Sequence, residues 1–242
     1  TLEQKKITPI VVGGKDRWPF LGWFSYLAQR IGGVDLYNEV CQGDKKMTEE
    51  AFVEAGEELR NLSKHGFING NLSMDAPTTE SLFAAGKAAM LITGSWSIPT
   101  FTSDEATSKD FSFFPFPTVV GGKEDESGYL YGGVANTLAI SKNTKNAEAA
   151  EKFVKFYLSE EEQKRTVERT GTFSSVKVEP DKDKMSPLAY EFSQYVSGEV
   201  QGFFPYTDQA LPPEESEKLL NALSAIVADE NTDVKSELAK VK

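Results

Sequence analysis

The sequence has 242 residues, enough for one large domain or two modest ones. Its 37 acidic residues outnumber the 26 basic ones, and the net charge of −11 argues against nucleic acid and anionic membranes as partners. The chain has one cysteine, Cys41, and one histidine, which is too few for a disulfide or for a zinc site of the usual kind. We therefore expect no metal and no other cofactor.

The first half of the chain is predicted to alternate short strands with helices. Apolar runs bounded by glycine or proline indicate strands, and apolar residues at helical spacing indicate helices. Thr48 is the expected N-cap of the second helix, and His65 is its expected last residue before Gly66. The expected strands are 7–12, 88–92 and 111–115, and the expected helices are 18–31, 49–65 and 77–86.

The second half is predicted to be mostly helical. Asn146 is an expected N-cap, Ser159 with Glu162 fits a capping box, and Ser186 followed by Pro187 marks a further helix start. Residues 129–141 are expected to be extended, and 202–206 irregular. The expected helices are 147–158, 160–170, 187–196, 219–227 and one from 233 onward. Helices with four or five short strands between them indicate an α/β fold of mixed connectivity.

Familiar catalytic and ion-binding motifs do not fit. The Gly121-Gly122-Lys123 stretch lacks the upstream glycine and the following hydroxyl residue of a phosphate-binding loop. The acidic stretch that begins at Asp229 resembles a calcium loop in spacing, but Val234 stands where glycine is needed and Lys240 where glutamate is needed. A Ser-His-Asp triad would need His65, which a helix C-terminus accounts for more simply.

Aromatic residues at the ends of predicted elements are the most informative feature. Large aromatics in such places can simply fill gaps, but four of them beside short polar side chains match what a neutral sugar needs. The ring covers the apolar face of the sugar, and carboxylates or amides bind its hydroxyls. The aromatic residues are Trp18, Trp96, Tyr131 and Tyr206, and the polar neighbours include Ser95, Asn136 and Asp208.

Five stretches in order resemble a known family, the family 1 extracellular solute-binding proteins of bacterial ABC sugar importers, which are relatives of maltose-binding protein. The most specific is LFAAGKAAM at 82–90, followed by GSW at 94–96. The other stretches are TPI with GGKD and tryptophan at 8–18, FFPFP at 113–117, YGG to LAIS at 131–141, and 147–171.

This resemblance implies a type II periplasmic-binding-protein-like fold, in which two α/β lobes close on a ligand about a hinge. In that fold, residues 1–131 would form the first part of the second, C-terminal lobe. Residues 132–197 would return to the first lobe, and 198–242 would add the closing helices of the second. Much of the N-terminal lobe is then expected to be missing from this sequence.

The resemblance also implies roles for particular residues. Trp96 matches the family's stacking tryptophan, and Gly132 and Gly133 match hinge-strand glycines whose backbone approaches the ligand. Asp16 and Trp18 match the start of a helix that borders the cleft, whereas Tyr206 and Asp208 match by order alone. The expected ligand-binding residues are Asp16, Trp18, Ser95, Trp96, Tyr131, Gly132, Gly133, Tyr206 and Asp208.

The expected function is that of a non-catalytic, substrate-binding subunit that captures an oligosaccharide and delivers it to ABC permease subunits. By the resemblance it would be a monomer, lipid-anchored outside the cytoplasmic membrane or periplasmic. Two alternatives stay open. One is a carbohydrate-active enzyme with paired carboxylates, which 37 acidic residues always allow. The other is a structural or adhesion module that binds no small ligand.

Overall fold

The structure, a computed structural model, describes residues 2–104, 106, 110–133, 137–172 and 174–242. Its strands are β1 (Thr8–Val11), β2 (Ala88–Leu91), β3 (Tyr129–Tyr131) and β4 (Gly202–Phe204). Its first helices are α1 (Trp18–Gly32), α2 (Val34–Gln42), α3 (Glu50–His65), α4 (Ala76–Ala84) and α5 (Ile98–Thr102). The later helices are α6 (Ala147–Tyr157), α7 (Glu160–Thr170), α8 (Pro187–Gly198), α9 (Thr207–Ala210), α10 (Pro213–Ala228) and α11 (Val234–Leu238).

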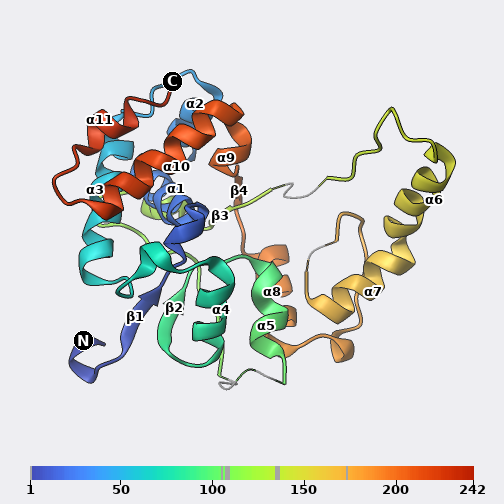
Figure 1. The fold of residues 1–242 in the computed structure, drawn as a ribbon. Helices are drawn as coiled ribbons and strands as arrows, with labels where there is room; N and C mark the ends of the chain where they lie inside the picture. Colours follow the sequence, from blue (N-terminus) through green and yellow to red (C-terminus); the bar gives the residue numbers. More distant parts are fainter. Residues whose placement is uncertain (1, 105, 107–109, 134–136, 173) are drawn as a thin grey trace.

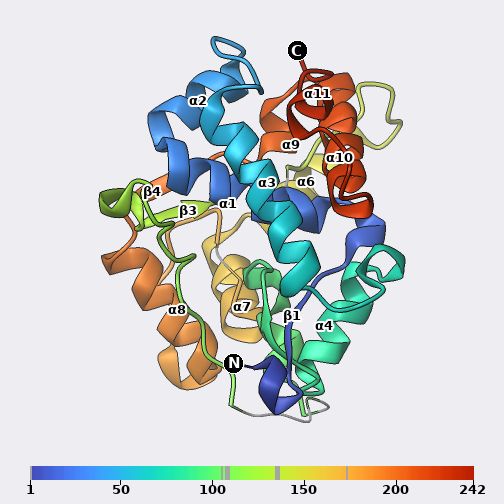
Figure 2. The same ribbon diagram turned by 90° about the vertical axis from the view of Figure 1, so that its left-hand side faces the viewer.

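Helix α1 is the centre of the main body, which we define as 7–104, 116–131 and 202–242. Its sequence is apolar almost all round, which is typical of a helix surrounded by other elements. Helices α2, α3 and α10 surround it, as Figures 1 and 2 show from two sides. The amphipathic helices contribute one apolar face each. The shared core includes Phe20, Phe24, Phe52, Leu59, Leu219, Leu223 and Ile226.

The strands form two parallel pairs. Strand β1 pairs with β2, with Ile10 opposite Met90, and β3 pairs with β4, with Tyr131 opposite Phe204. Mixed connectivity was expected, but every ladder between the described strands is parallel. In each parallel pair the carboxyl ends of both strands lie at the same edge, so the segments that follow them emerge together. This property positions the candidate site described below.

The segment 137–198 differs from the main body. Helices α7 and α8 pack on α5 through a small apolar cluster that includes Ile98, Val167 and Leu188. Helix α6, by contrast, buries none of its residues and lies at the right-hand edge of Figure 1. Helix α6 therefore has an apolar face that no described element buries. Among the described residues, no helix has both the length and the apolarity needed to cross a membrane.

Most predicted elements are confirmed, but several expectations are wrong. Residues 111–115 form no strand, since no described strand pairs with them; the rings of Phe111 and Phe113 pack against other aromatic rings. Residues 202–204, expected to be irregular, pair with β3 as strand β4. Only 129–131 of the expected extended segment 129–141 is strand among the described residues, and Asn136 lies outside them.

Helix starts supply the remaining corrections. The N-cap of α3 is Glu49, one residue after the expected Thr48, and no side chain caps it. Helix α2 was not predicted at all. Its first amide, that of Val34, donates to a carboxylate oxygen of Glu126 over a distance of 2.6 Å. Because that cap lies far away in the sequence, no local pattern announces the helix.

Candidate ligand-binding site

A cavity of about 240 Å³ lies between α1, the segment after β2, the end of β3 and helix α9. Five predicted site residues line it, namely Trp18, Trp96, Tyr131, Tyr206 and Asp208. The other lining residues are Leu21, Gly22, Tyr26, Ile92, Thr93, Gly94 and Gln209. The structure therefore brings together side chains that are up to 190 positions apart, from Trp18 to Asp208.

The first aromatic pair comes from the carboxyl ends of β1 and β2. The chain turns after β1 and begins α1 with Trp18, and after β2 it forms one turn of helix, Ser95–Ser97, that carries Trp96. The two indoles meet edge to face, with ring centroids 6.0 Å apart and planes at 70°. Trp96 is 47% exposed, so one face of its ring stays open to a ligand. Such a face can cover the C–H side of a sugar.

The second aromatic pair comes from the carboxyl ends of β3 and β4 in the same way. Tyr131 ends β3, and Tyr206 follows β4 as the N-cap of α9. Their rings meet edge to face at 4.8 Å and 77°. Burial raises the pKa of Tyr131 to about 12, so its hydroxyl stays neutral at physiological pH. That hydroxyl accepts the amide hydrogen of Thr207 at 3.1 Å.

A buried hydroxyl cluster fixes the second pair to helices α1 and α2. The Thr207 hydroxyl lies 2.7 Å from that of Ser25 and 2.5 Å from that of Tyr37. The hydroxyl of Tyr26 accepts the Tyr131 amide at 3.1 Å. These bonds join α1, α2, β3 and α9. The wall that carries Tyr131, Tyr206 and Asp208 is therefore held before any ligand arrives.

Asp208 is the one carboxylate among the described residues that line the cavity. It lies in the first turn of α9 and is half-buried. Burial raises its pKa, and hydrogen bonds from the Asp208 and Gln209 amides oppose that rise in part. A carboxylate in this place can accept hydrogen bonds from two sugar hydroxyls. A glycosidase would need a second carboxylate within about 10 Å.

Four predicted site residues lie outside this cavity's lining. The carboxylate of Asp16 accepts the Ala76 amide at 2.7 Å, and so satisfies the start of α4. The Gly132 amide donates to the Phe204 carbonyl at 2.9 Å and is thus not free for a ligand. Gly133 has a φ of +145°, with open space where a side chain would begin. Ser95 is half-buried at the start of the turn that carries Trp96.

Sequence reasoning missed Gly22 and Tyr26, which line the cavity from α1. Together with Trp18 they follow a four-residue spacing, which places all three on one face of the helix. That spacing could have identified them. The predicted site residues include Trp18, at the start of this helix, but not the next two residues on the same face.

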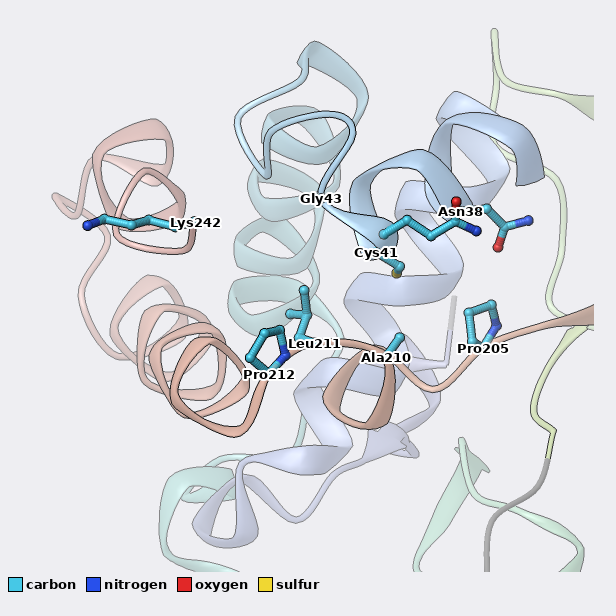
Figure 3. A pocket seen from close by; sticks show the side chains of 9 residues that line it. Asn38, Cys41, Gly43, Pro205, Ala210, Leu211, Pro212 and Lys242 are labelled. Carbon is cyan, nitrogen blue, oxygen red and sulfur yellow. The ribbon is translucent and has the colours of Figure 1, made fainter.

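A second hollow, of about 460 Å³, lies at the carboxyl end of α2 and is shown in Figure 3. Its wall includes Asn38, Cys41, Leu211, Pro212 and Lys242. Burial raises the pKa of Cys41 to about 12, so it remains a thiol and not a reactive thiolate. Five of the predicted site residues line the first cavity, and none lines this one. In the part of the chain that the structure describes, no three potential metal ligands come together.

Known proteins resemble this chain in sequence. The sequence model of the bacterial extracellular solute-binding proteins matches residues 2–164. The Multiple sugar-binding protein of Streptococcus mutans is 26% identical over 250 residues, which cover 96% of this chain and 58% of that protein. That relative is named as a sugar-binding protein and not as an enzyme.

Solved structures show the fold. A chain from work on xylan utilization by Caldanaerobius polysaccharolyticus superposes with a TM-score of 0.90 at 24% identity, covering 99% of this chain and 62% of that one. A chitin oligosaccharide binding protein gives a TM-score of 0.89, also at 24% identity, with 99% and 60% covered. The fold is thus α/β and periplasmic-binding-protein-like, and this chain spans about 60% of the length of these solved chains.

Proposed function

The chain belongs to the bacterial extracellular solute-binding protein family, and we propose that it contributes one wall of an oligosaccharide-binding cleft in an ABC importer. One observation carries the proposal. Two edge-to-face aromatic pairs, each built at the carboxyl ends of a parallel strand pair, line one cavity together with Asp208, the one carboxylate among its described lining residues. Aromatic faces with one hydrogen-bond acceptor suit a neutral sugar.

In this proposal Trp96 stacks on one sugar ring, with Trp18 supporting it from the side. Asp208, which lies beside the second aromatic pair, accepts hydrogen bonds from ring hydroxyls. Two separate aromatic pairs favour a ligand of more than one sugar unit, because each pair can hold a separate ring. The names of the relatives, one for multiple sugars and one for chitin oligosaccharide, support the same ligand class.

We further propose that the cleft has a second wall. Strand β3 leads into 132–197 and β4 follows that segment, so the chain leaves and re-enters the main body at one paired site. With the exposed face of α6, this supports the division into 1–131, 132–197 and 198–242, the middle part packing on another lobe. Lobe closure would then present a monomeric, sugar-loaded protein to the permease outside the cytoplasmic membrane.

Calorimetry and tryptophan fluorescence test the sugar site directly. The chain is titrated with maltotriose, raffinose, a xylo-oligosaccharide and a chitin oligosaccharide. For the sugar that binds best, Trp96→Ala raises Kd about 30-fold, since central tryptophans at binding sites contribute about 2 kcal/mol. Phe156→Ala, at an exposed aromatic on α6, is the control and leaves Kd unchanged. Equal affinity of the Trp96 variant and the unmodified chain would contradict the proposal.

The same mixtures separate binding from catalysis. Among the described lining residues Asp208 has no carboxylate partner, so we expect each sugar to be recovered intact by chromatography after overnight incubation. Shorter sugars that appear with the unmodified chain and disappear with Asp208→Asn would establish the enzyme instead.

A further inference from the structure

We propose that Glu80 is a positioning residue for Trp96, and that it sets ligand affinity without lining the cavity. This inference rests on the proposed sugar site. Glu80 lies on α4, where it is half-buried and faces the segment that joins β2 to α5. Trp96 lies in that segment, directly before Ser97. Glu80 therefore acts on the stacking ring through the backbone that carries it.

The contacts among Glu80, Thr93 and Ser97 hold the two ends of this segment together. The Ser97 hydroxyl, which is fully buried, lies 2.5 Å from the carboxylate oxygen Oε1 of Glu80. The Thr93 hydroxyl lies 2.7 Å from that of Ser97 and 3.3 Å from the same Glu80 oxygen. Each hydroxyl has one proton to donate. The short contact assigns the Ser97 proton to Glu80, so Thr93 donates to Ser97 in its shorter bond.

Holding Thr93 and Ser97 together determines where the indole lies. Between them, the Ser97 amide donates to the Gly94 carbonyl at 3.0 Å and completes a tight turn. A Cβ at Gly94 would stand 2.2 Å from Cζ3 of Trp96, so the ring lies directly over the Gly94 backbone. Trp18 meets the ring edge to face from the side. The orientation of Trp96 thus depends on the shape of the turn.

A carboxylate holds this turn in one shape more firmly than a neutral acceptor would. Hydrogen bonds to a charged acceptor are shorter and stronger than neutral ones, and the turn is only five residues long. The carboxylate of Glu80 is half-buried, and the buried Ser97 hydroxyl donates to it. A turn held in one shape presents the ring ready to stack, so less conformational freedom is lost when a sugar binds.

The first experiment follows the ring without any ligand. Trp18→Phe and Trp23→Phe leave Trp96 as the only tryptophan, and time-resolved fluorescence anisotropy reports how tightly it is held. Adding Glu80→Ala lowers the residual anisotropy and increases quenching by acrylamide. Glu80→Gln, which keeps an acceptor oxygen, restores most of both. Glu54→Ala on α3 removes the same charge at an exposed site and changes neither reading.

The second experiment measures affinity in the unmodified tryptophan background, with maltotriose, raffinose, a xylo-oligosaccharide and a chitin oligosaccharide. Glu80→Ala raises Kd about tenfold, the size expected when one hydrogen bond to a charged group is lost. Glu80→Gln raises it less. Ser97→Ala matches Glu80→Ala, whereas Ser81→Ala, whose hydroxyl bonds within α4, has no effect.

The outcomes separate the two proposals. If none of the four sugars binds the unmodified chain, the sugar site fails while the anisotropy still decides the role of Glu80. If sugar binds and Glu80→Ala leaves both Kd and anisotropy unchanged, the role of Glu80 is overturned. Should Glu80→Ala unfold, as circular dichroism would reveal, Ser97→Ala and Glu80→Gln are judged by the same two readings.

Discussion

Helices α3 and α6 have the same amphipathic pattern and opposite surroundings. In α3, Phe52 and Leu59 are both 0% exposed and pack on α1. In α6, Phe153 and Phe156 are 58% and 57% exposed, and the helix buries no residue. Ion pairs cover the polar side of α6, one between Glu148 and Lys152 and one between Glu151 and Lys155. An apolar stripe thus predicts that a helix face packs against another element, but it does not establish that this element is among the described residues.

The same contrast separates the main body from 137–198. Around α1, aromatic rings contact one another in a continuous cluster. The buried guanidinium of Arg30 joins this cluster to β3, because it donates to the Tyr129 carbonyl. Around α6 the contacts are local. Loop residues Leu138 and Ile140, which precede α6, are exposed as well. The two regions should therefore respond differently to matched substitutions.

The largest difference is expected for one phenylalanine in each helix. Phe52→Ala in α3 should lower the free energy of unfolding by about 3 to 5 kcal/mol, because it empties a packed site against Phe24 and Tyr37. Phe153→Ala in α6 should change it by about 0.5 kcal/mol or less. Urea denaturation measures both. A similar cost at the two positions would contradict the contrast, and a larger cost at Phe153 once a second lobe is supplied would sharpen it.

Arginines provide the next test. Arg30 is fully buried, and its guanidinium donates to the backbone carbonyls of Phe116, Ser127 and Tyr129 at 2.9 to 3.2 Å. Arg30→Leu leaves several buried acceptors unpaired and should cost roughly 3 kcal/mol. Arg165→Leu in α7 removes an exposed ion pair with Glu162 and should leave the urea midpoint in place. An unchanged midpoint for Arg30→Leu would show that the carbonyls find other donors.

The smallest expected effect concerns Asp208 and has opposite signs for stability and binding. Burial raises its pKa in the folded chain, so the folded state favours the protonated form. The stability from this group is present below the ordinary aspartate pKa of about 4 and is lost as pH rises through the raised value. Asp208→Asn should therefore raise Tm slightly at pH 7 and not at pH 3, while weakening sugar binding at pH 7.

The control for Asp208 lies in the other region. Asp183→Asn makes the same change at an exposed position and should not raise Tm at pH 7. Differential scanning calorimetry at the two pH values decides the matter. A gain for Asp208→Asn that is the same at pH 3 and pH 7 would mean that the effect is not one of charge burial.

Much of this molecule could be predicted from local patterns. The helix starts at Ser159 and Ser186 use their own side chains, as their sequences indicate. What could not be predicted depends on contacts between distant residues. The start of α2 is satisfied by Glu126, and the strand character of 202–204 depends on pairing with β3. Residue propensities within a window of ten residues predict neither contact, because both partners lie far away in the sequence.

The candidate site divides in the same manner. The placement of Trp18, Trp96, Tyr131 and Tyr206 beside turns was visible in the sequence, and all four line one cavity. The sequence did not show that Asp16 and the Gly132 amide are already hydrogen-bonded within the protein, because each bonds to a group on another element. The role inferred for Glu80 also required the fold, since Ser97 lies 17 positions away.

Length, composition and motif order were enough to predict the α/β fold and the family to which the chain belongs. Periodic patterns and caps are local, and the chain carries them wherever it folds. Tertiary structure alone decided which apolar faces are covered, which polar groups are already hydrogen-bonded, and that two aromatic pairs and Asp208 line one cavity. Those outcomes depend on parallel strands ending at a shared edge, a relation that exists only once the distant strands have paired.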